Sequence, residues 1–162
     1  MPNASIQAMR PAFIQLLKHY PAQASREELY GEIGWDDLID NQSYMNTCAV
    51  RMSYGLLRAG VPLPGARMKA KAGVLAGKLI EPGQEKLSEI LKMIWGWPEV
   101  YTDEDEARAG IGSRNGVVSF FRIGGGAVGH IDLIVHRPGS RFQDCARTCF
   151  WAAKPIWFWP LN

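Results

Sequence analysis

The segment NTCAVRMSYGLLRAG, residues 46–60, decides the fold, because it predicts a helix that is apolar nearly all round. Asn46 and Thr47 are residue types that cap helix N-termini, so Cys48 is expected in the first helical turn. Gly60, followed closely by two prolines, ends the segment in the way that helix C-termini commonly end. We therefore expect a buried helix that starts with a cysteine and packs against other elements.

Two shorter helices are expected before this segment. Ser25 and Glu28 form a capping-box pattern at the start of SREELYGEI, and the polar and aromatic stretch that follows is interpreted as a loop. The first helix is expected to end at Pro21. Its apolar positions recur at helical spacing and are Ile6, Met9, Phe13, Leu16, Leu17 and Tyr20.

The pattern changes from helix to strand in the second half of the chain. GQEKLSEILKMIWGWP, residues 83–98, predicts a helix that stops at Gly96, whereas residues 66–80 fit either a helix or an edge strand. The runs VVSFFRI, AVGHIDLIV and PIWFWPL are rich in β-formers, and glycines join the first two. The expected fold class is α+β, with N-terminal helices packed on an antiparallel β-sheet in one domain, residues 1–162.

Composition excludes several classes of function. The 18 Lys and Arg are scattered among 16 Asp and Glu, for a net charge of +2, so the basic patch of a nucleic-acid binder is missing. No run approaches the roughly 20 apolar residues needed to cross a bilayer, and residues 1–21 lack the pattern of a signal peptide. We expect a protein made in the cytoplasm without a signal peptide, with no nucleic-acid partner and no membrane insertion.

The position of Cys48 suggests a nucleophile. Unpaired N–H groups and the helix dipole favour an anion in the first turn, and the thiolate is the nucleophilic form of cysteine. A small apolar side chain that fills core space is the alternative interpretation. The histidines can discriminate between the two, because a nucleophilic cysteine needs a base.

Of the three histidines, His130 is the best candidate for that base. His19 lies near the expected end of the first helix, where a cation is favourable, and His136 lies beside a turn. His130 lies on a predicted strand, with Asp132 on the same face and apolar residues on the other. Either the polar face is half exposed to solvent, or it presents an imidazole to the thiolate.

The chain has three cysteines, Cys48, Cys145 and Cys149, which allow at most one disulfide and leave one thiol over, and Cys145 and Cys149 are the closely spaced pair. Their spacing permits a bridge, which would indicate an oxidising place of action, but two reduced thiols fit the residues equally well. They also support a different hypothesis, in which the chain is a non-enzymatic metal- or redox-responsive binding protein that uses Cys145 and Cys149 with a nearby histidine. A lone C-x₃-C pair is weak evidence for a zinc site.

Several motifs together resemble the amidase effectors of bacterial type VI secretion, specifically the fourth amidase-effector family. They are TCAVRMSYGLLRAG, GHIDLIV after a glycine-rich loop, the closely spaced cysteine pair and the terminal IWFWPL. The resemblance spans most of the chain and implies an NlpC-like papain fold, in which a cysteine helix packs on a sheet that carries the histidine. It also implies a Cys145–Cys149 disulfide suited to action outside the cytoplasm.

The resemblance assigns Cys48 as nucleophile and His130 as base, but it leaves the third catalytic residue open. The family has an aspartate between the paired cysteines, where this chain has Arg147. Asp144 and Asp132 are the nearest carboxylates. A residue on a neighbouring strand can lie closer than one two positions along the same strand, so we expect Asp144 to orient His130 and Asp132 to matter less.

The activity implied by the resemblance is cleavage of peptidoglycan stem peptides between γ-D-glutamate and meso-diaminopimelate. It implies secretion by the type VI machinery, action in the periplasm of rival cells and a cognate immunity protein as partner. No cofactor is expected, because the glycines of GIGSRNG, residues 110–116, do not match a dinucleotide-binding motif.

Overall fold

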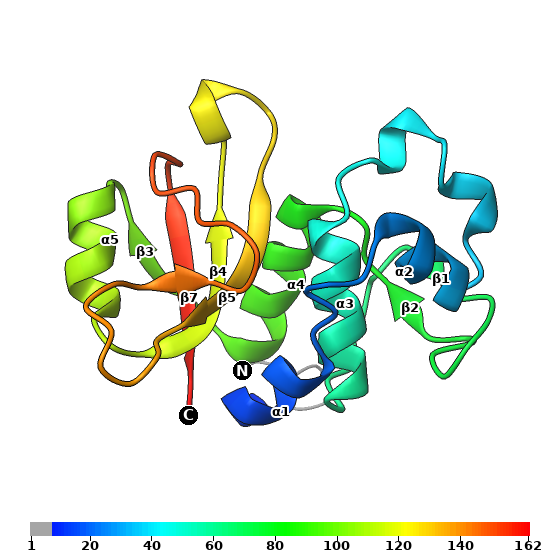
Figure 1. The fold of residues 1–162 in the computed structure, drawn as a ribbon, viewed down its shortest axis with the longest axis horizontal. Helices are drawn as coiled ribbons and strands as arrows, with labels where there is room; N and C mark the ends of the chain where they lie inside the picture. Colours follow the sequence, from blue (N-terminus) through cyan, green and yellow to red (C-terminus); the bar gives the residue numbers. More distant parts are fainter. Residues whose placement is uncertain (1–7) are drawn as a thin grey trace.

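The helix that begins at Cys48 is α3 (Cys48–Arg58), and in the computed structural model, which describes residues 8–162, it lies between two packed regions (Figure 1). On one side is the main sheet, and on the other are α2 and a small hairpin. Met52 and Leu56 pack in the cluster that includes sheet residues, whereas Val50 packs in the cluster under the hairpin. The apolar residues nearly all round α3 are therefore explained, because both sides of the helix are covered.

The main sheet has five strands, all antiparallel to their neighbours. In spatial order they are β3 (Glu99–Tyr101), β7 (Ile156–Leu161), β4 (Asn115–Phe120), β5 (His130–Val135) and β6 (Asp144–Cys145). The three predicted strands are thus the long central ones, while the sequence pattern did not indicate the short edge strands.

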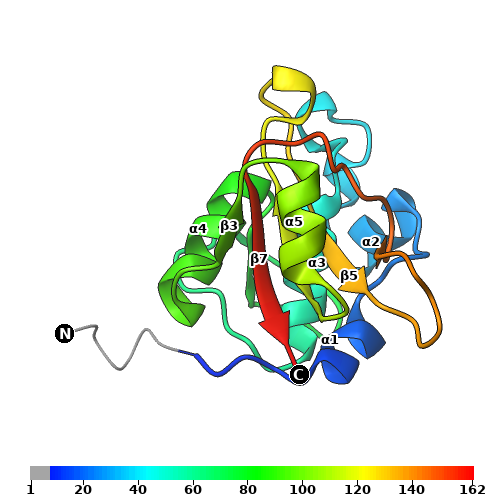
Figure 2. The ribbon, with the colours of Figure 1, turned by 90° about the vertical axis from the view of Figure 1, so that its left-hand side faces the viewer.

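Helices cover both faces of this sheet. The other helices are α1 (Phe13–His19), α2 (Arg26–Glu32), α4 (Gln84–Trp95) and α5 (Glu104–Ile111). Residues of α1, α3 and α4 share one apolar cluster with Leu133 of the sheet, and α5 packs with Ile134 on the opposite face, where Figure 2 shows it in front of β7. The expected class, α+β with an antiparallel sheet, is confirmed.

Capping explains where several of these helices begin and end. The Ser25 hydroxyl accepts a hydrogen bond from the Glu28 N–H, as the capping-box pattern predicts, and Asp103 caps α5 in the same manner. Helix α4 ends at Gly96, which has a φ of 89°, a conformation that glycine adopts readily. Among the described residues, no helix is long and apolar enough to cross a bilayer.

The first helix is shorter than the apolar spacing predicts. It begins at Phe13, and Met9 is 91% exposed, while Ile6 lies outside the described residues. Pro11 is the physical reason, because the residue before a proline is disfavoured in the helical region. The Arg10 side chain instead donates hydrogen bonds to the carbonyls of Trp95 and Pro160, which ties the segment down in an extended form.

The connections between the main elements contain one hairpin and three short 3₁₀ helices. Residues 66–80, left open by the sequence, contain the hairpin of β1 (Met68–Lys69) and β2 (Leu79–Ile80). The expected loop after α2 holds two short 3₁₀ helices, Asp36–Leu38 and Gln42–Tyr44, and a third, Ile123–Gly125, lies in the glycine-rich connection between β4 and β5.

Candidate active site

Cys48 is the first residue of α3, as its sequence position predicts, and it is buried. Of the two expected capping residues, Asn46 makes the bond: its Oδ1 accepts from the Cys48 N–H at 3.1 Å. The Thr47 hydroxyl instead accepts from Nε of Arg51 at 2.8 Å. The first turn of α3, which carries the sulfur, is thus fixed by Asn46 through the Cys48 N–H and by Arg51 through the Thr47 hydroxyl.

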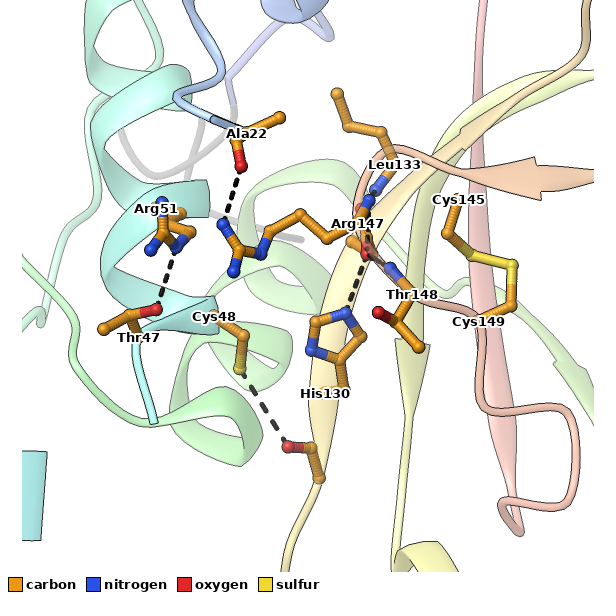
Figure 3. Close-up of polar contacts among 12 residues, drawn as sticks. Ala22, Thr47, Cys48, Arg51, His130, Leu133, Cys145, Arg147, Thr148 and Cys149 are labelled. Carbon is orange, nitrogen blue, oxygen red and sulfur yellow. Dashed lines mark hydrogen bonds and ion pairs between the residues drawn. A yellow bond between two sulfur atoms is a disulfide. The ribbon is translucent and has the colours of Figure 1, made fainter. Parts of the chain in front are cut away.

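His130 opens β5 beside that helix start. Strand β6 pairs only with Ile134 and Val135, so the edge of β5 at His130 is left free of a strand neighbour and accommodates α3. In Figure 3 the Cys48 sulfur and the His130 ring lie side by side, one from each element. The Cys48 thiol is 3.9 Å from the carbonyl oxygen of Gly129, the residue before the histidine.

Asp132 supports the other side of the imidazole. Its Oδ2 lies 2.7 Å from Nε2 of His130, and its side chain is fully buried. The carboxylate also accepts hydrogen bonds from the backbone N–H groups of Leu133, Arg147 and Thr148. Four donors thus fix the carboxylate, and the carboxylate in turn fixes the ring.

The charge on His130 follows from these neighbours. Burial by itself lowers the pKa of the imidazole, but the hydrogen bond to the Asp132 carboxylate and the adjacent Cys48 sulfur outweigh burial and raise the pKa from 6.5 to about 9. At neutral pH the ring is therefore protonated on both nitrogens and positively charged. An imidazolium between a sulfur and a carboxylate is suited to donate that proton to a leaving group.

The geometric expectation for Asp144 is wrong. Asp144 pairs with Val135, at the far end of β5 from His130, and the five intervening steps amount to about 16 Å at the usual strand rise. The turn after β5 is long, so β6 pairs only with the last two residues of β5, Ile134 and Val135. It is Arg147, at the family's aspartate position, whose backbone reaches Asp132.

The polar face of β5 is not half exposed, which was one of the two interpretations of the sequence. Asp132 is fully buried and the His130 side chain is only 11% exposed. The chain after β6 covers this face: Phe150 packs edge-on against the His130 ring, with Phe120 stacked on the ring from the adjacent strand.

Cys145 and Cys149 form a disulfide, and Cys48 is the free thiol. The bridge closes the loop whose N–H groups hold Asp132. Within residues 8–162, no group of three or more His, Cys, Asp or Glu side chains is placed to hold a metal ion. The paired sulfurs also cannot serve as thiolate ligands, so the metal-binding hypothesis for this pair has no support in the geometry.

Two arginines reinforce the region behind Cys48. Arg51 is buried and donates to the carbonyls of Pro21 and Ala24, while Arg147 donates to the carbonyl of Ala22 between them. Burial, followed by the Arg147 charge, lowers the pKa of Arg51. The loop between α1 and α2 is thus tied by one guanidinium from α3 and one from the disulfide loop.

The other two histidines lie away from this cluster. His19 is the last residue of α1, as expected. The His136 N–H, just after β5, donates to Oδ1 of Asn115. The structure therefore brings together Cys48, His130 and Asp132 from the predicted set and leaves Asp144 apart.

Two residues of the site were missed by the sequence reasoning. Asn46 was considered only as a helix cap, yet its Nδ2 also donates to the Gly129 carbonyl at 3.2 Å and so links α3 to β5. A Cβ on Gly129 would overlap the carboxamide of Gln84, which would have to move from its hydrogen bond to the Ser119 hydroxyl. A glycine directly before the histidine was the available signal.

A thiol on a helix start, an imidazole beside it and a carboxylate behind the imidazole define the class of cysteine hydrolases. Residues 44–159 match the model of one family, type VI secretion system (T6SS) amidase effector protein 4, abbreviated Tae4. The chain belongs to this family. It is therefore a type VI secretion effector and a peptidoglycan amidase, as the sequence motifs indicated.

Solved structures show the same fold. The crystal structure of the type VI effector Tae4 from Enterobacter cloacae is 21% identical, with a TM-score of 0.76, over 96% of this chain and 99% of that one. The Tae4–Tai4 effector–immunity complexes from Enterobacter cloacae and Salmonella Typhimurium match at 20% and 18% identity, with TM-scores of 0.74 and 0.72. Each match covers 95% of this chain and all of the other. Among curated proteins, no sequence matches this chain.

Proposed function

We propose that the chain hydrolyses the amide bond between γ-D-glutamate and meso-diaminopimelate in peptidoglycan stem peptides. Cys48 is the nucleophile, His130 the general acid and base, and Asp132 the residue that orients the imidazole. The observation that carries this assignment is the position of His130 between the Cys48 sulfur and the Asp132 carboxylate, in a chain of an amidase family.

The reaction proceeds in two halves. The Cys48 thiol passes its proton to His130, and the resulting thiolate attacks the γ-glutamyl carbonyl carbon and forms a C–S bond. The C–N bond then breaks, and the departing amine of diaminopimelate takes the proton from His130. The proton comes from Nδ1, because Nε2 is bound to Asp132. In the second half, neutral His130 takes a proton from water, the hydroxide cleaves the thioester, and Cys48 leaves as the thiolate.

The negative charge on the tetrahedral intermediate needs donors near the sulfur. The Cys48 N–H is the donor nearest in the chain, and in this structure it is occupied by Oδ1 of Asn46. Substrate that uses this N–H must displace the Asn46 carboxamide. Asn46 therefore occupies the proposed oxyanion donor in this structure and also bonds the Gly129 carbonyl.

The place of action is the periplasm of a rival cell, where peptidoglycan is accessible and the Cys145–Cys149 disulfide persists. Because two of the similar structures are complexes of Tae4 with the immunity protein Tai4, we also assign this chain a cognate immunity protein as partner. Expression behind a periplasmic signal should lyse a host that tolerates the same protein in its cytoplasm. Equal toxicity in both compartments would contradict this assignment.

Digestion of purified diaminopimelate-type peptidoglycan tests the bond. Wild-type protein should release fragments with a new free γ-carboxyl on glutamate, identified by mass spectrometry, and Cys48→Ala should release none while unfolding at a temperature close to that of the wild type. Cleavage at another bond, or an unchanged fragment profile with wild-type protein, would contradict the proposal.

A further inference from the structure

A groove begins beside the proposed nucleophile and runs to the β1–β2 hairpin. It consists of two adjoining hollows of about 530 and 400 Å³ that share Ser43, Arg67, Pro82 and Gly83 in their walls. The larger hollow reaches Gly129, whose carbonyl oxygen lies 3.9 Å from the Cys48 sulfur. A peptide held in this groove would therefore pass beside Asn46 and Gly129, which both contact Cys48.

Arg67 presents a fixed guanidinium to this groove. Its Nε and Nη2 donate to the carboxylate of Glu81 at 3.0 and 2.6 Å, and Glu81 is fully buried while the Arg67 side chain is 58% exposed. The Gly83 N–H also donates to Glu81, and a Cβ on Gly83 would lie 2.8 Å from Nη2 of Arg67. Glu81, itself held by the Gly83 N–H, thus binds the Nε and Nη2 atoms of the guanidinium and leaves Nη1 unbound to either residue.

A second cationic side chain, Lys86, lines the larger hollow. Helix α4 begins at Gln84 without a side-chain cap, and Lys86 lies in its first turn, where the N–H groups and the helix dipole favour an anion. Glu85 is the one acidic side chain among the described residues that line the two hollows. The groove thus exposes two cationic side chains, Arg67 and Lys86, and one anionic side chain, Glu85, while buried Glu81 balances the charge of Arg67 from beneath.

We propose that this groove binds a carboxylate of the stem peptide, with Arg67 and Lys86 as its ligands. The proposal rests on the proposed function, which places a γ-glutamyl carbonyl at Cys48. The stem peptide has carboxylates on both sides of that carbonyl, the α-carboxylate of D-glutamate and the distal carboxylate of diaminopimelate, and both offer the same chemistry to a guanidinium and an ammonium group.

Amidated substrates test the proposal and separate the two sources. The substrates are synthetic L-Ala-γ-D-Glu-meso-diaminopimelate peptides with all three carboxylates free, with only the glutamate α-carboxyl amidated, or with only the distal diaminopimelate carboxyl amidated. Wild-type protein should lose about tenfold or more in kcat/KM for one of the two amidated peptides, mainly through KM, because a charge-assisted contact is lost. The peptide that suffers identifies the bound carboxylate.

Two variants place the effect in the groove. Lys86→Gln and Arg67→Lys should each lower kcat/KM about tenfold for the free-acid peptide and have little further effect on the sensitive amidated peptide. Arg67→Lys keeps a cation beside Glu81, so it avoids leaving a buried carboxylate unpaired. Lys78→Gln, an exposed lysine outside the groove, is the matched control and should behave as wild type.

Binding to the Cys48→Ala variant separates this inference from the proposed function. Calorimetry should give a dissociation constant at least about tenfold weaker for the sensitive amidated peptide. Carboxylate-dependent binding without cleavage by wild-type protein would overturn the proposed bond and leave the groove assignment standing. Binding and kcat/KM that are the same for free and amidated peptides, or variants that weaken all three peptides equally, would overturn the groove assignment.

Discussion

Replacing Asp132 with asparagine should disable the enzyme by changing the charge on His130. The substitution keeps the size of the side chain but removes the negative charge that faces Nε2 at 2.7 Å. Burial then lowers the pKa of His130 with only Cys48 left to oppose it. The shift from 6.5 to about 9 is worth about 3 kcal/mol of stabilisation of the imidazolium, and this sets the scale of the loss.

Expressed as a rate, about 3 kcal/mol corresponds to a loss of about 10²-fold in turnover. The assay is kcat/KM against pH on a defined stem peptide, together with an NMR titration of the His130 ring. Wild-type activity should fall as pH rises through about 9, where the imidazolium loses its proton, and Asp132→Asn should move this alkaline limb to lower pH. A purely structural role for Asp132 would lower activity without moving the limb.

The same substitution has a defined effect on stability. A histidine whose pKa is raised on folding contributes stability that is fully present below about pH 6.5 and is lost as pH rises through about 9. The difference in the free energy of unfolding between wild type and Asp132→Asn should therefore be largest at and below pH 6.5 and should shrink above pH 9. The N–H groups of Arg147 and Thr148 add a loss that does not depend on pH.

Asp144→Asn is the matched control, because this exposed carboxylate lies opposite Val135 and not His130. It should retain wild-type turnover and the wild-type alkaline limb. An inactive Asp144→Asn protein beside a normal Asp132→Asn protein would contradict the role assigned to Asp132.

Three further substitutions test the supports of the site. Replacing Cys145 and Cys149 with serine should cost about 2 kcal/mol of stability by the entropy of the small loop, measured by urea unfolding, and should lower turnover because the loop holds Asp132; unchanged turnover would show that the loop stays in place without the bridge. Gly129→Ala should lower turnover about tenfold or more by forcing a Cβ against a neighbouring carboxamide, and full activity would contradict the close packing there. Asn46→Ala should lower stability by about 1 kcal/mol through loss of the cap on α3, and an unchanged melting temperature would refute that role.

Local patterns were sufficient to place the elements that carry the proposed nucleophile and base, Cys48 and His130. Capping residues before Cys48 and apolar residues on every side of its helix are local properties, and so is the alternation that puts His130 and Asp132 on one face of a strand. The bridge between Cys145 and Cys149 was compatible with their spacing, but the residues alone also allowed two free thiols. The motifs, compared with a known family, then indicated the activity.

Which carboxylate meets His130 was decided only by tertiary structure. Strand register depends on where a turn ends, and the turn after β5 returns the chain opposite Val135, so Asp144 is left far from the histidine. Asp132, only two residues from His130 on the same strand, bonds the ring because both side chains lie on one covered face of β5. The N–H groups that complete its shell come from about 15 residues further along the chain, by way of a loop closed by the disulfide. Backbone donors of this kind leave no trace in side-chain identity, because every residue except proline supplies the same N–H group.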